Sequence, residues 1–307
     1  MKTRLLIGGL LATSLTLSAQ IFTEKIAREL AFEKKGNNAL MIFNVNGSVK
    51  VESYTGDKIL VEVEKTISAK TEARLAEGKE EIQLGVMDRA DTVMLYVKGI
   101  CSEFGKQEPK SKRGKRQSKW NGWGYMWSDW GRGRTTSNDR DCEKRYDYNM
   151  SFVIKVPSGI SVLASTINGG DIEISGISKY VLADNVNGSI RLTNISGPTN
   201  ASTINGSVDL DYSCNPSGDS RYYSLNGDIN ANFRKGLGAQ LTFKSFNGDF
   251  YSSVDDITPM AVMVEKYDKG DGIHYKVNGN RYRVRQGGPL LDFETFNGDV
   301  YLKEKEN

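Results

Sequence analysis

Few residues in this chain have the types and spacing of a catalytic centre. The only histidine, His274, lies in an alternating segment beside Tyr275. The sequence contains no zinc-ligand spacing, no glycine-rich phosphate loop and no nucleophile motif. A lone histidine of this kind is typical of a surface or partly packed residue. We therefore expect no catalytic residues, no metal site and no cofactor.

Carboxylates offer a second kind of chemistry. Enzymes that cleave glycosidic bonds need only a few carboxylates on one face. Asp209, Asp211 and Asp228 could supply them after folding. Scattered aspartates more often face solvent, so a secreted carbohydrate-active enzyme on a β-helix scaffold is the alternative to a noncatalytic protein.

Calcium binding is a third chemistry to consider, because four aspartates follow Asn-Gly pairs closely. These are Asp171, Asp228, Asp249 and Asp299. Calcium requires several oxygen ligands at once, and serine takes the equivalent place in three other copies. We expect these side chains to make local hydrogen bonds at chain corners instead.

The densest set of candidate binding residues lies in segment 106–134. This segment has nine basic and two acidic residues and holds all four tryptophans of the chain. Basic groups attract anionic surfaces, and aromatic faces are enriched at recognition sites. The expected binding residues are Trp120, Trp123, Trp127, Trp130, Lys112, Arg113, Lys115 and Arg116. The alternative is a surface loop whose tryptophans fold back onto the flank of the fold.

Three cysteines bear on the same region. Cys101 and Cys142 flank the basic segment, and Cys214 lies far from both. An exported protein can form disulfides. We expect a Cys101–Cys142 disulfide, with Cys214 left free or paired between chains.

A repeat indicates the elements that must carry these residues. Asn-Gly follows a single apolar residue eight times, at Asn46-Gly47, Asn168-Gly169, Asn187-Gly188, Asn205-Gly206, Asn226-Gly227, Asn247-Gly248, Asn278-Gly279 and Asn297-Gly298. From Asn168 the steps are 19, 18, 21 and 21 residues. A fixed period near 20 residues is typical of a repeat architecture.

Each copy predicts a strand, a corner and a second strand. Residues 202–210 alternate between apolar and polar on both sides of the Asn-Gly pair, which tolerates φ > 0. An antiparallel meander and a β-solenoid both fit, and the period favours the solenoid. We predict an all-β, single-stranded, parallel β-helix-like solenoid with coils of ~20 residues.

Two finer expectations follow from the repeat. The apolar residues before the asparagines should form one continuous buried row; they are Ile167, Val186, Ile204, Leu225 and Phe246. The Asn278 copy is irregular, because Arg281 stands where the other copies have an apolar residue. That copy is expected to be a local hairpin.

The chain divides into five segments. Residues 1–19 have a basic start, an apolar run and a small-residue end, which predicts a secretory signal peptide. Residues 20–100 are an N-terminal β segment, in which 71–81 predicts a short helix capped by Thr71. Residues 101–147 are the basic, tryptophan-rich insertion. Regular coils follow over 148–303, and 304–307 are expected to be a frayed tail.

The sequence also resembles a known family. The evidence is the leader, the segment Val45 to Val51 around the first Asn-Gly pair, the segment Val156 to Gly159, and a ladder of Thr-Ile-Asn-Gly-type repeats. Together they resemble the bacterial putative-adhesin family of domain-of-unknown-function proteins, related to head-domain autotransporter-like adhesins. The resemblance covers roughly Asn38 to Leu302. It implies a β-solenoid on or near the cell envelope and carries over no catalytic residues.

These features predict a noncatalytic, adhesin-like protein of the cell envelope, exported to the periplasm, the cell surface or the medium. The mature chain has 39 basic and 38 acidic residues once Lys2 and Arg4 are removed from the total of 41. This balance gives no general attraction to nucleic acid. Expected partners are envelope or extracellular glycans, or an anionic surface, with no transmembrane span. A periplasmic structural or stress-related protein without a ligand is a further alternative.

Overall fold

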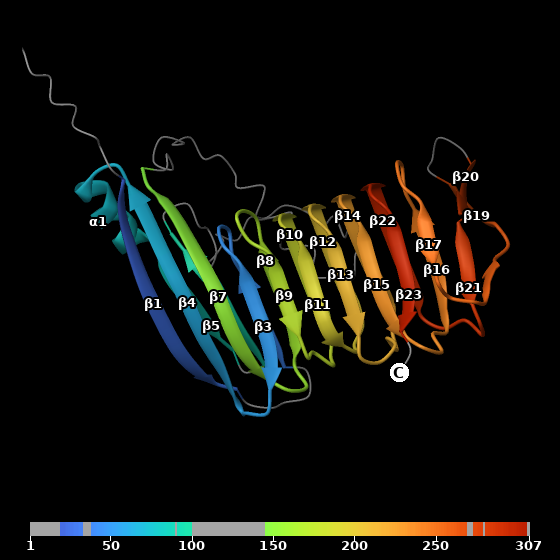
Figure 1. Ribbon diagram of the computed structural model, residues 1–307, viewed down its shortest axis with the longest axis horizontal. Coiled ribbons are helices and arrows are strands. Elements are labelled where there is room, and N and C mark those ends of the chain that lie inside the picture. Colours follow the sequence, from blue (N-terminus) through green and yellow to red (C-terminus); the bar gives the residue numbers. More distant parts are fainter. Residues whose placement is uncertain are drawn as a thin grey trace, which may run out of the picture.

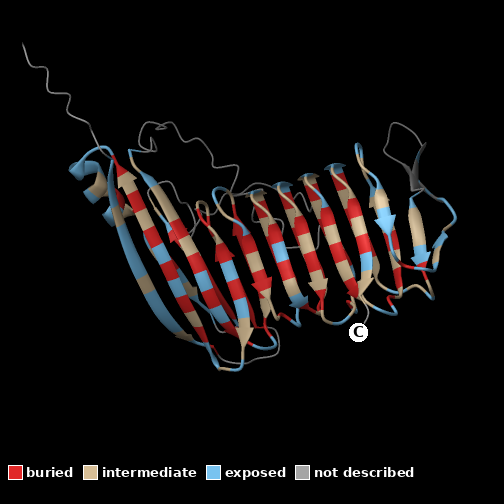
Figure 2. Ribbon diagram, viewed as in Figure 1, coloured by how far each residue is buried: buried red, intermediate tan, exposed pale blue. Residues whose placement is uncertain are grey.

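Two large β-sheets face each other and make up most of the molecule, which is elongated along the direction in which the strands stack (Figure 1). The structure is a computed structural model that describes residues 19–32, 38–89, 91–99, 145–268, 273–278 and 280–305. Alternating side chains on each strand point into the space between the sheets. Figure 2 shows the resulting bands of buried and less buried residues.

Sheet A has ten strands. In spatial order they are β1 (Gln20–Ala31), β4 (Lys58–Ala69), β7 (Asp147–Pro157), β3 (Val49–Tyr54), β9 (Ile172–Ser175), β11 (Ile190–Ile195), β13 (Val208–Tyr212), β15 (Ile229–Arg234), β23 (Val300–Lys305) and β17 (Phe250–Ser252).

Sheet B has eleven strands. In spatial order they are β18 (Ile257–Pro259), β21 (Arg281–Val284), β16 (Ala239–Lys244), β22 (Leu290–Asn297), β14 (Ser220–Asn226), β12 (Thr199–Asn205), β10 (Val181–Asn187), β8 (Ser161–Thr166), β2 (Ala39–Phe43), β6 (Thr92–Lys98) and β5 (Gln83–Asp88). A separate hairpin consists of β19 (Met263–Asp268) and β20 (Ile273–Asn278).

The central strands of both sheets are parallel and in register with the sequence repeat. Val181 of β10 pairs with Val162 of β8 and with Thr199 of β12, one repeat earlier and one repeat later. In sheet A, Ile190 of β11 pairs with Ile172 and Val208 in the same way. Each repeat therefore contributes one strand to sheet B, a corner, and one strand to sheet A.

The ends of the sheets are antiparallel, so both sheets are mixed. β1 pairs antiparallel with β4, β4 with β7, and β5 with β6 at one end. At the other end, β21 pairs antiparallel with both β16 and β18. The prediction of an all-β protein is confirmed at this level, in the form of two large mixed sheets.

Spatial order departs from sequence order at the C-terminal end. β22 lies between β14 and β16, and β23 lies between β15 and β17. The last repeat along the chain, residues 290–305, is thus inserted between the two repeats that precede it. Figure 1 shows its red strands flanked by orange ones. The expected stacking in sequence order is wrong here, because the excursion over 253–289 lets the chain return to an inner place.

The core is a single apolar layer between the sheets. Inward residues such as Val162, Val181 and Ile190 are fully buried. Tyr212 and Tyr222 are buried as well, and their hydroxyl oxygens lie 2.7 Å apart, so each phenol finds a partner across the layer. A smaller apolar cluster lies on the opposite face of sheet B, formed by Ala39, Met41, Met94, Leu163 and Leu182.

The predicted helix is confirmed as α1 (Glu72–Glu81), and the Thr71 hydroxyl accepts the Arg74 N–H as its N-cap. The expected N-terminal β segment begins with β1 at Gln20. The predicted frayed tail begins too early, because β23 runs to Lys305 and the Glu304 carboxylate binds Arg285. The described part of the chain contains no helix long and apolar enough to cross a lipid bilayer.

Candidate functional site

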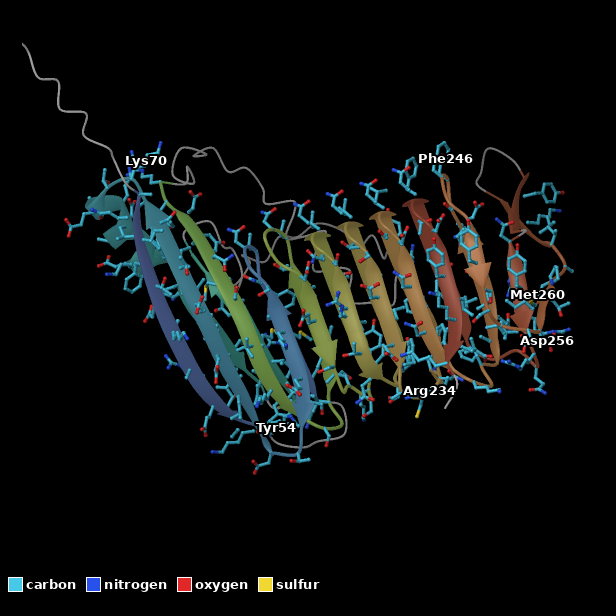
Figure 3. The ribbon with its side chains drawn as sticks, viewed as in Figure 1. Tyr54, Lys70, Arg234, Phe246, Asp256 and Met260 are labelled. Atoms are coloured by element: carbon cyan, nitrogen blue, oxygen red, sulfur yellow. The ribbon has the colours of Figure 1, made fainter. Side chains whose placement is uncertain are left out.

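Seven of the eight Asn-Gly pairs lie in one line, which we call the corner edge. In spatial order its asparagines are Asn46, Asn168, Asn187, Asn205, Asn226, Asn297 and Asn247. The Nδ2 of each asparagine donates to Oδ1 of the previous one, over 2.8 to 3.3 Å. Phe246, labelled in Figure 3, marks the end of this edge, and Arg234 lies on the opposite edge. The corner edge is therefore a continuous ladder of side-chain amides.

The eighth pair is not part of the ladder. Asn278 ends β20 and pairs with Met263 in the antiparallel hairpin. This copy differs from the others as expected, but the expected hairpin around it is wrong: β20 pairs with β19, whereas the strand that follows, β21, pairs with β16 and β18.

Glycine is required at the corner because neighbouring repeats meet through their backbones. A Cβ on Gly206 would lie 2.3 Å from the carbonyl oxygen of Gly188, and one on Gly227 would lie 2.2 Å from that of Gly206. No side chain fits at that distance. The Asn168 copy has one extra residue at its corner. There the close approach is made by Gly170 rather than Gly169, because a Cβ on Gly170 would lie 2.3 Å from the Ser48 nitrogen.

At six of the seven ladder corners, a buried polar side chain two residues before the asparagine bonds a corner glycine carbonyl; at the seventh, the Ser245 hydroxyl has no such partner among the described residues. Thr203 Oγ1 donates to the Gly188 carbonyl over 2.8 Å, and Ser224 Oγ donates to the Gly206 carbonyl over 2.9 Å. Thr166 makes the same bond to Gly47, over 2.8 Å. The sequence interpretation missed these residues. Their signal is a Ser, Thr or Asn at this place in all seven ladder copies: Asn44, Thr166, Asn185, Thr203, Ser224, Ser245 and Thr295.

The predicted buried row of apolar residues is wrong. Ile204 is 39% exposed and Phe246 is 73% exposed, whereas Ile167, Val186 and Leu225 are half-buried. Successive side chains on a strand point to opposite faces. Because the polar residue before each of them points inward under the corner, the apolar residue must point outward. The corner edge thus carries, beside its amide ladder, a row of apolar side chains that are half-buried or exposed.

The small polar residues after the corner glycines join neighbouring repeats. Asp171 Oδ1 accepts the Ser189 N–H over 2.8 Å. Asp228 Oδ1 accepts the Asp299 N–H over 2.9 Å, and Asp299 Oδ1 accepts the Asp249 N–H over 2.9 Å. These carboxylates are engaged with backbone donors, as we expected for corner residues. No cluster of three or more His, Cys, Asp or Glu side chains that could hold a metal occurs in the described ranges.

Aromatic side chains gather where the ladder ends. The rings of Phe246 and Phe296 stack with their centroids 4.8 Å apart and their planes 4° apart. On the outer face of sheet A, Tyr251 and Tyr301 stack at 5.2 Å and 12°. The charge of Asp249 raises the pKa of Tyr251, and a hydrogen bond to Asp299 raises the pKa of Tyr301. Both phenols therefore stay protonated as hydrogen-bond donors at neutral pH.

The carboxylates considered for sugar cleavage have structural partners. Asp209 Oδ1 accepts the Asn230 amide over 2.9 Å. Asp211 forms an ion pair with Lys305, and Asp228 binds the Asp299 N–H. These contacts hold neighbouring repeats together. His274 lies in β20, opposite Tyr267 in the hairpin register.

The binding residues expected in the basic segment lie outside the described residues, as do Cys101 and Cys142. They are Trp120, Trp123, Trp127, Trp130, Lys112, Arg113, Lys115 and Arg116. Cys214 is described, exposed and free. The segment joins β6 of sheet B to β7 of sheet A, the same passage that an Asn-Gly pair makes elsewhere. Met150 of β7 donates its N–H to the Asn46 carbonyl over 2.8 Å. β7, the strand that follows this segment, therefore passes next to the Asn46 end of the ladder.

Comparisons with known proteins give two similar solved structures. One is described as a putative cell adhesion protein from Clostridium sporogenes; it is 11% identical, with 92% of this chain and 100% of that chain covered and a TM-score of 0.44. The other is described as a putative adhesin from Bacteroides fragilis; it is 12% identical, with 92% and 97% covered and a TM-score of 0.36. No family model matches the chain, and no curated protein matches its sequence. Neither likeness assigns the chain to a family.

Proposed function

We propose that this protein is a noncatalytic, adhesin-like protein of the cell envelope that binds extended ligands along its corner edge. The observation that carries the proposal is the row of outward-pointing apolar side chains beside the amide ladder, three of which are exposed. Ile204, Phe296 and Phe246 are 39%, 43% and 73% exposed. An edge that offers apolar contact and hydrogen bonds at every repeat suits a long, linear partner.

The finer architecture belongs to the same proposal: the central repeats are coils of a β-solenoid. In-register parallel pairing in both sheets supports it, as do the backbone contacts between successive corner glycines. In a solenoid each coil touches only its neighbours. Identical side chains then recur at ~4.8 Å along the axis, which gives the edge its regular spacing.

Export is also part of the proposal. Residues 1–19 have the pattern of a secretory signal peptide, and the first strand, β1, begins at Gln20. The proposed partners are glycans of the envelope or its surroundings, with the basic, tryptophan-rich segment adding contacts to anionic ones. Exposed charges are screened over ~8 Å at physiological salt, so this second contribution should weaken as salt rises.

The test is a binding screen of residues 20–307 against neutral and anionic polysaccharides, with mass spectrometry of the glycans after incubation. We expect binding to at least one polysaccharide without release of shorter sugars. Released sugars would favour the carbohydrate-active enzyme, and a screen without any binding would favour a structural protein.

A matched variant joins residues 105 and 135. We expect it to keep the fold, because long surface insertions cost only modest closure entropy. It should lose the salt-sensitive part of the binding to anionic polysaccharides. Unfolding of this variant would show that the tryptophan cluster is part of the core.

A further inference from the structure

The corner edge ends in a stacked pair of aromatic rings, Phe296 and Phe246, which we call the aromatic step. One face of this pair is exposed. Phe296 belongs to the inserted repeat and lies between Leu225 and Phe246 along the row. One face of its ring is covered by the Phe246 ring, which stacks on it in parallel at 4.8 Å. Phe246 belongs to the last rung of the ladder as far as the chain is described, and it is 73% exposed. A flat apolar group could continue the stack on its outer face.

The amide ladder has a direction, and it ends at the same place. Asn247 uses Nδ2 to donate to Asn297 Oδ1 over 2.9 Å. At every other rung, the asparagine Oδ1 accepts a hydrogen bond from the side-chain amide of the next asparagine. Asn247 is the last asparagine of the ladder, so no further ladder amide donates to its Oδ1. The ring face of Phe246 and the Oδ1 of Asn247 therefore both lie at the end of the ladder, on adjacent residues.

Three carboxylates lie beside this step, together with the ammonium of Lys303, whose Nζ lies over the Tyr301 ring, 5.6 Å from its centroid. Asp299 and Asp249 follow the corners of the two terminal repeats, and Asp228 lies one repeat further in. The stacked pair of Tyr251 and Tyr301 lies next to them on sheet A, with Tyr251 49% exposed. The Tyr301 hydroxyl donates to Asp299 Oδ2 over 3.1 Å. Carboxylates repel anions, and both carboxylate and phenol oxygens accept hydrogen bonds from neutral hydroxyl groups.

We infer that the outer face of Phe246 and the amide of Asn247 form a binding site for one sugar ring of a neutral polysaccharide. The ring's C–H face stacks on Phe246 as the next step of the aromatic row, and one of its hydroxyls donates to Asn247 Oδ1. Neighbouring sugars of the same chain lie along the carboxylate and tyrosine side. The inference rests on the proposed function, because it names the ligand class and the place of binding on the corner edge.

A neutral sugar fits better than the other ligands that stack on aromatic rings. Nucleic acids and sulfated or uronic polysaccharides carry negative charges that would meet Asp249 and Asp299. An apolar peptide would cover the exposed polar side chains of Asn247 and Asp249 without replacing the water that hydrates them. A sugar ring supplies an apolar face and several hydroxyl donors in one flat unit, which matches the mixture of groups at this step.

The experiment measures binding of residues 20–307 to hexasaccharides of glucose, mannose, galactose and N-acetylglucosamine, and to heparin, by isothermal titration calorimetry. For the neutral hexasaccharide that binds, Phe246→Ser should weaken affinity about tenfold, because stacking energy near 1.4 kcal/mol is lost. Phe246→Tyr should restore it. Ile21→Ser is the matched control, since Ile21 is an apolar residue of similar exposure (68%) in β1, outside the corner edge, and it should leave affinity unchanged.

Thermal melting of each variant separates loss of binding from loss of folding, and the exposure of Phe246 predicts little change in melting temperature. Equal affinity of wild type and Phe246→Ser would overturn the inference, as would tighter binding to heparin than to every neutral hexasaccharide. If both Phe246→Ser and the variant that joins residues 105 and 135 keep the affinity for the neutral hexasaccharide, the proposed binding along the corner edge stands and this site does not. If it binds no glycan of any class, both fail.

Discussion

The chain crosses between the two sheets along two long edges of the molecule, and the two kinds of crossing differ. At the corner edge it passes from sheet B to sheet A, and at the opposite edge it returns to sheet B. At four central corners, two residues separate the strand in sheet B from the strand in sheet A, as at Gly206-Ser207 between β12 and β13. On the opposite edge, the return takes from three residues (196–198) to seven (213–219). The repeat lengths of 18 to 21 residues therefore vary almost entirely at the opposite edge.

The difference follows from what each edge touches. At the corner edge, backbones of successive repeats are in contact, as Gly206 and Gly188 show. At the opposite edge, the fit differs from repeat to repeat: a Cβ on Gly197 would lie 1.7 Å from the Lys179 carbonyl oxygen, whereas one on Gly236 would meet nothing within 4 Å. A uniform corner is a requirement of close stacking, whereas the opposite edge has room for turns of different length.

The largest expected effect comes from changing the length of each edge by insertion. One alanine inserted between Gly206 and Ser207 would shift β13 by one residue and turn Val208, Leu210 and Tyr212 out of the core. We expect loss of cooperative folding, measured by thermal unfolding and soluble yield. Two glycines inserted between Ser217 and Gly218, on the opposite edge, should cost less than about 1 kcal/mol, because loop closure depends weakly on length.

Equal tolerance of the two insertions would remove the distinction between the edges. A variant with the alanine insertion that melts at the wild-type temperature would show that the corner can bulge without moving the strand.

The second effect comes from adding one methyl group at each edge. Gly206→Ala would place a Cβ 2.3 Å from the Gly188 carbonyl oxygen, so the two repeats must separate, at a cost of about 3 kcal/mol. Gly236→Ala is the matched variant. Its φ of +87° costs about 1 kcal/mol in strain, and its Cβ has open space. Chemical denaturation measures both, and a larger loss for Gly236→Ala would contradict the prediction.

Local patterns were sufficient to predict the strands, the helix and the corners. Each Asn-Gly pair of the ladder turns the chain at a corner, and a period of ~20 residues leaves few ways to stack the repeats. Thr71 and the run of helix-forming residues after it indicated α1 without reference to the rest of the chain. These features depend on neighbours in the sequence.

Two features could not be predicted, because they depend on contacts distant in sequence. The place of residues 290–305 between β14 and β16 is set by pairings such as Ser220 with Leu291, and no local pattern encodes it. The outward direction of Ile204 follows from Thr203 pointing inward to bind the Gly188 carbonyl. Apolar character alone predicts burial, so the outward-pointing row of the candidate site was assigned to the core.

The third effect tests the ion pair that fixes the long excursion at the opposite edge. Arg285 donates from both terminal nitrogens to Glu304, over 2.7 and 2.8 Å, and the carboxylate also accepts the Leu237 N–H. We expect Glu304→Gln to cost about 2 kcal/mol at pH 7, since these are hydrogen bonds to a charged group. Glu173→Gln, at an exposed pair with Lys50, should cost less than about 1 kcal/mol.

The cost of Glu304→Gln should depend on pH in a defined direction. The hydrogen bond from Arg285 lowers the pKa of Glu304 below its ordinary value of 4.5. The stabilisation is therefore complete above about pH 4.5 and is lost as the pH falls through the lowered value. Unfolding free energies at pH 7 and pH 3 measure this, and an equal difference between wild type and variant at both would contradict it.

The smallest effect compares one asparagine from each edge. On the opposite edge, Asn215 binds the backbone of the next repeat twice, since Nδ2 donates to the Arg234 carbonyl and Oδ1 accepts the Arg234 N–H, each over 2.9 Å. Asn215→Ala leaves both groups without these partners and should cost about 1–2 kcal/mol. Asn205 on the corner edge binds only other asparagine side chains, over 2.8 and 2.9 Å, in an exposed position. Water can replace those bonds, so Asn205→Ala should cost about 0.5 kcal/mol. A larger loss for Asn205→Ala in chemical denaturation would show that the amide ladder, rather than the glycine backbone beneath it, holds the corner edge together.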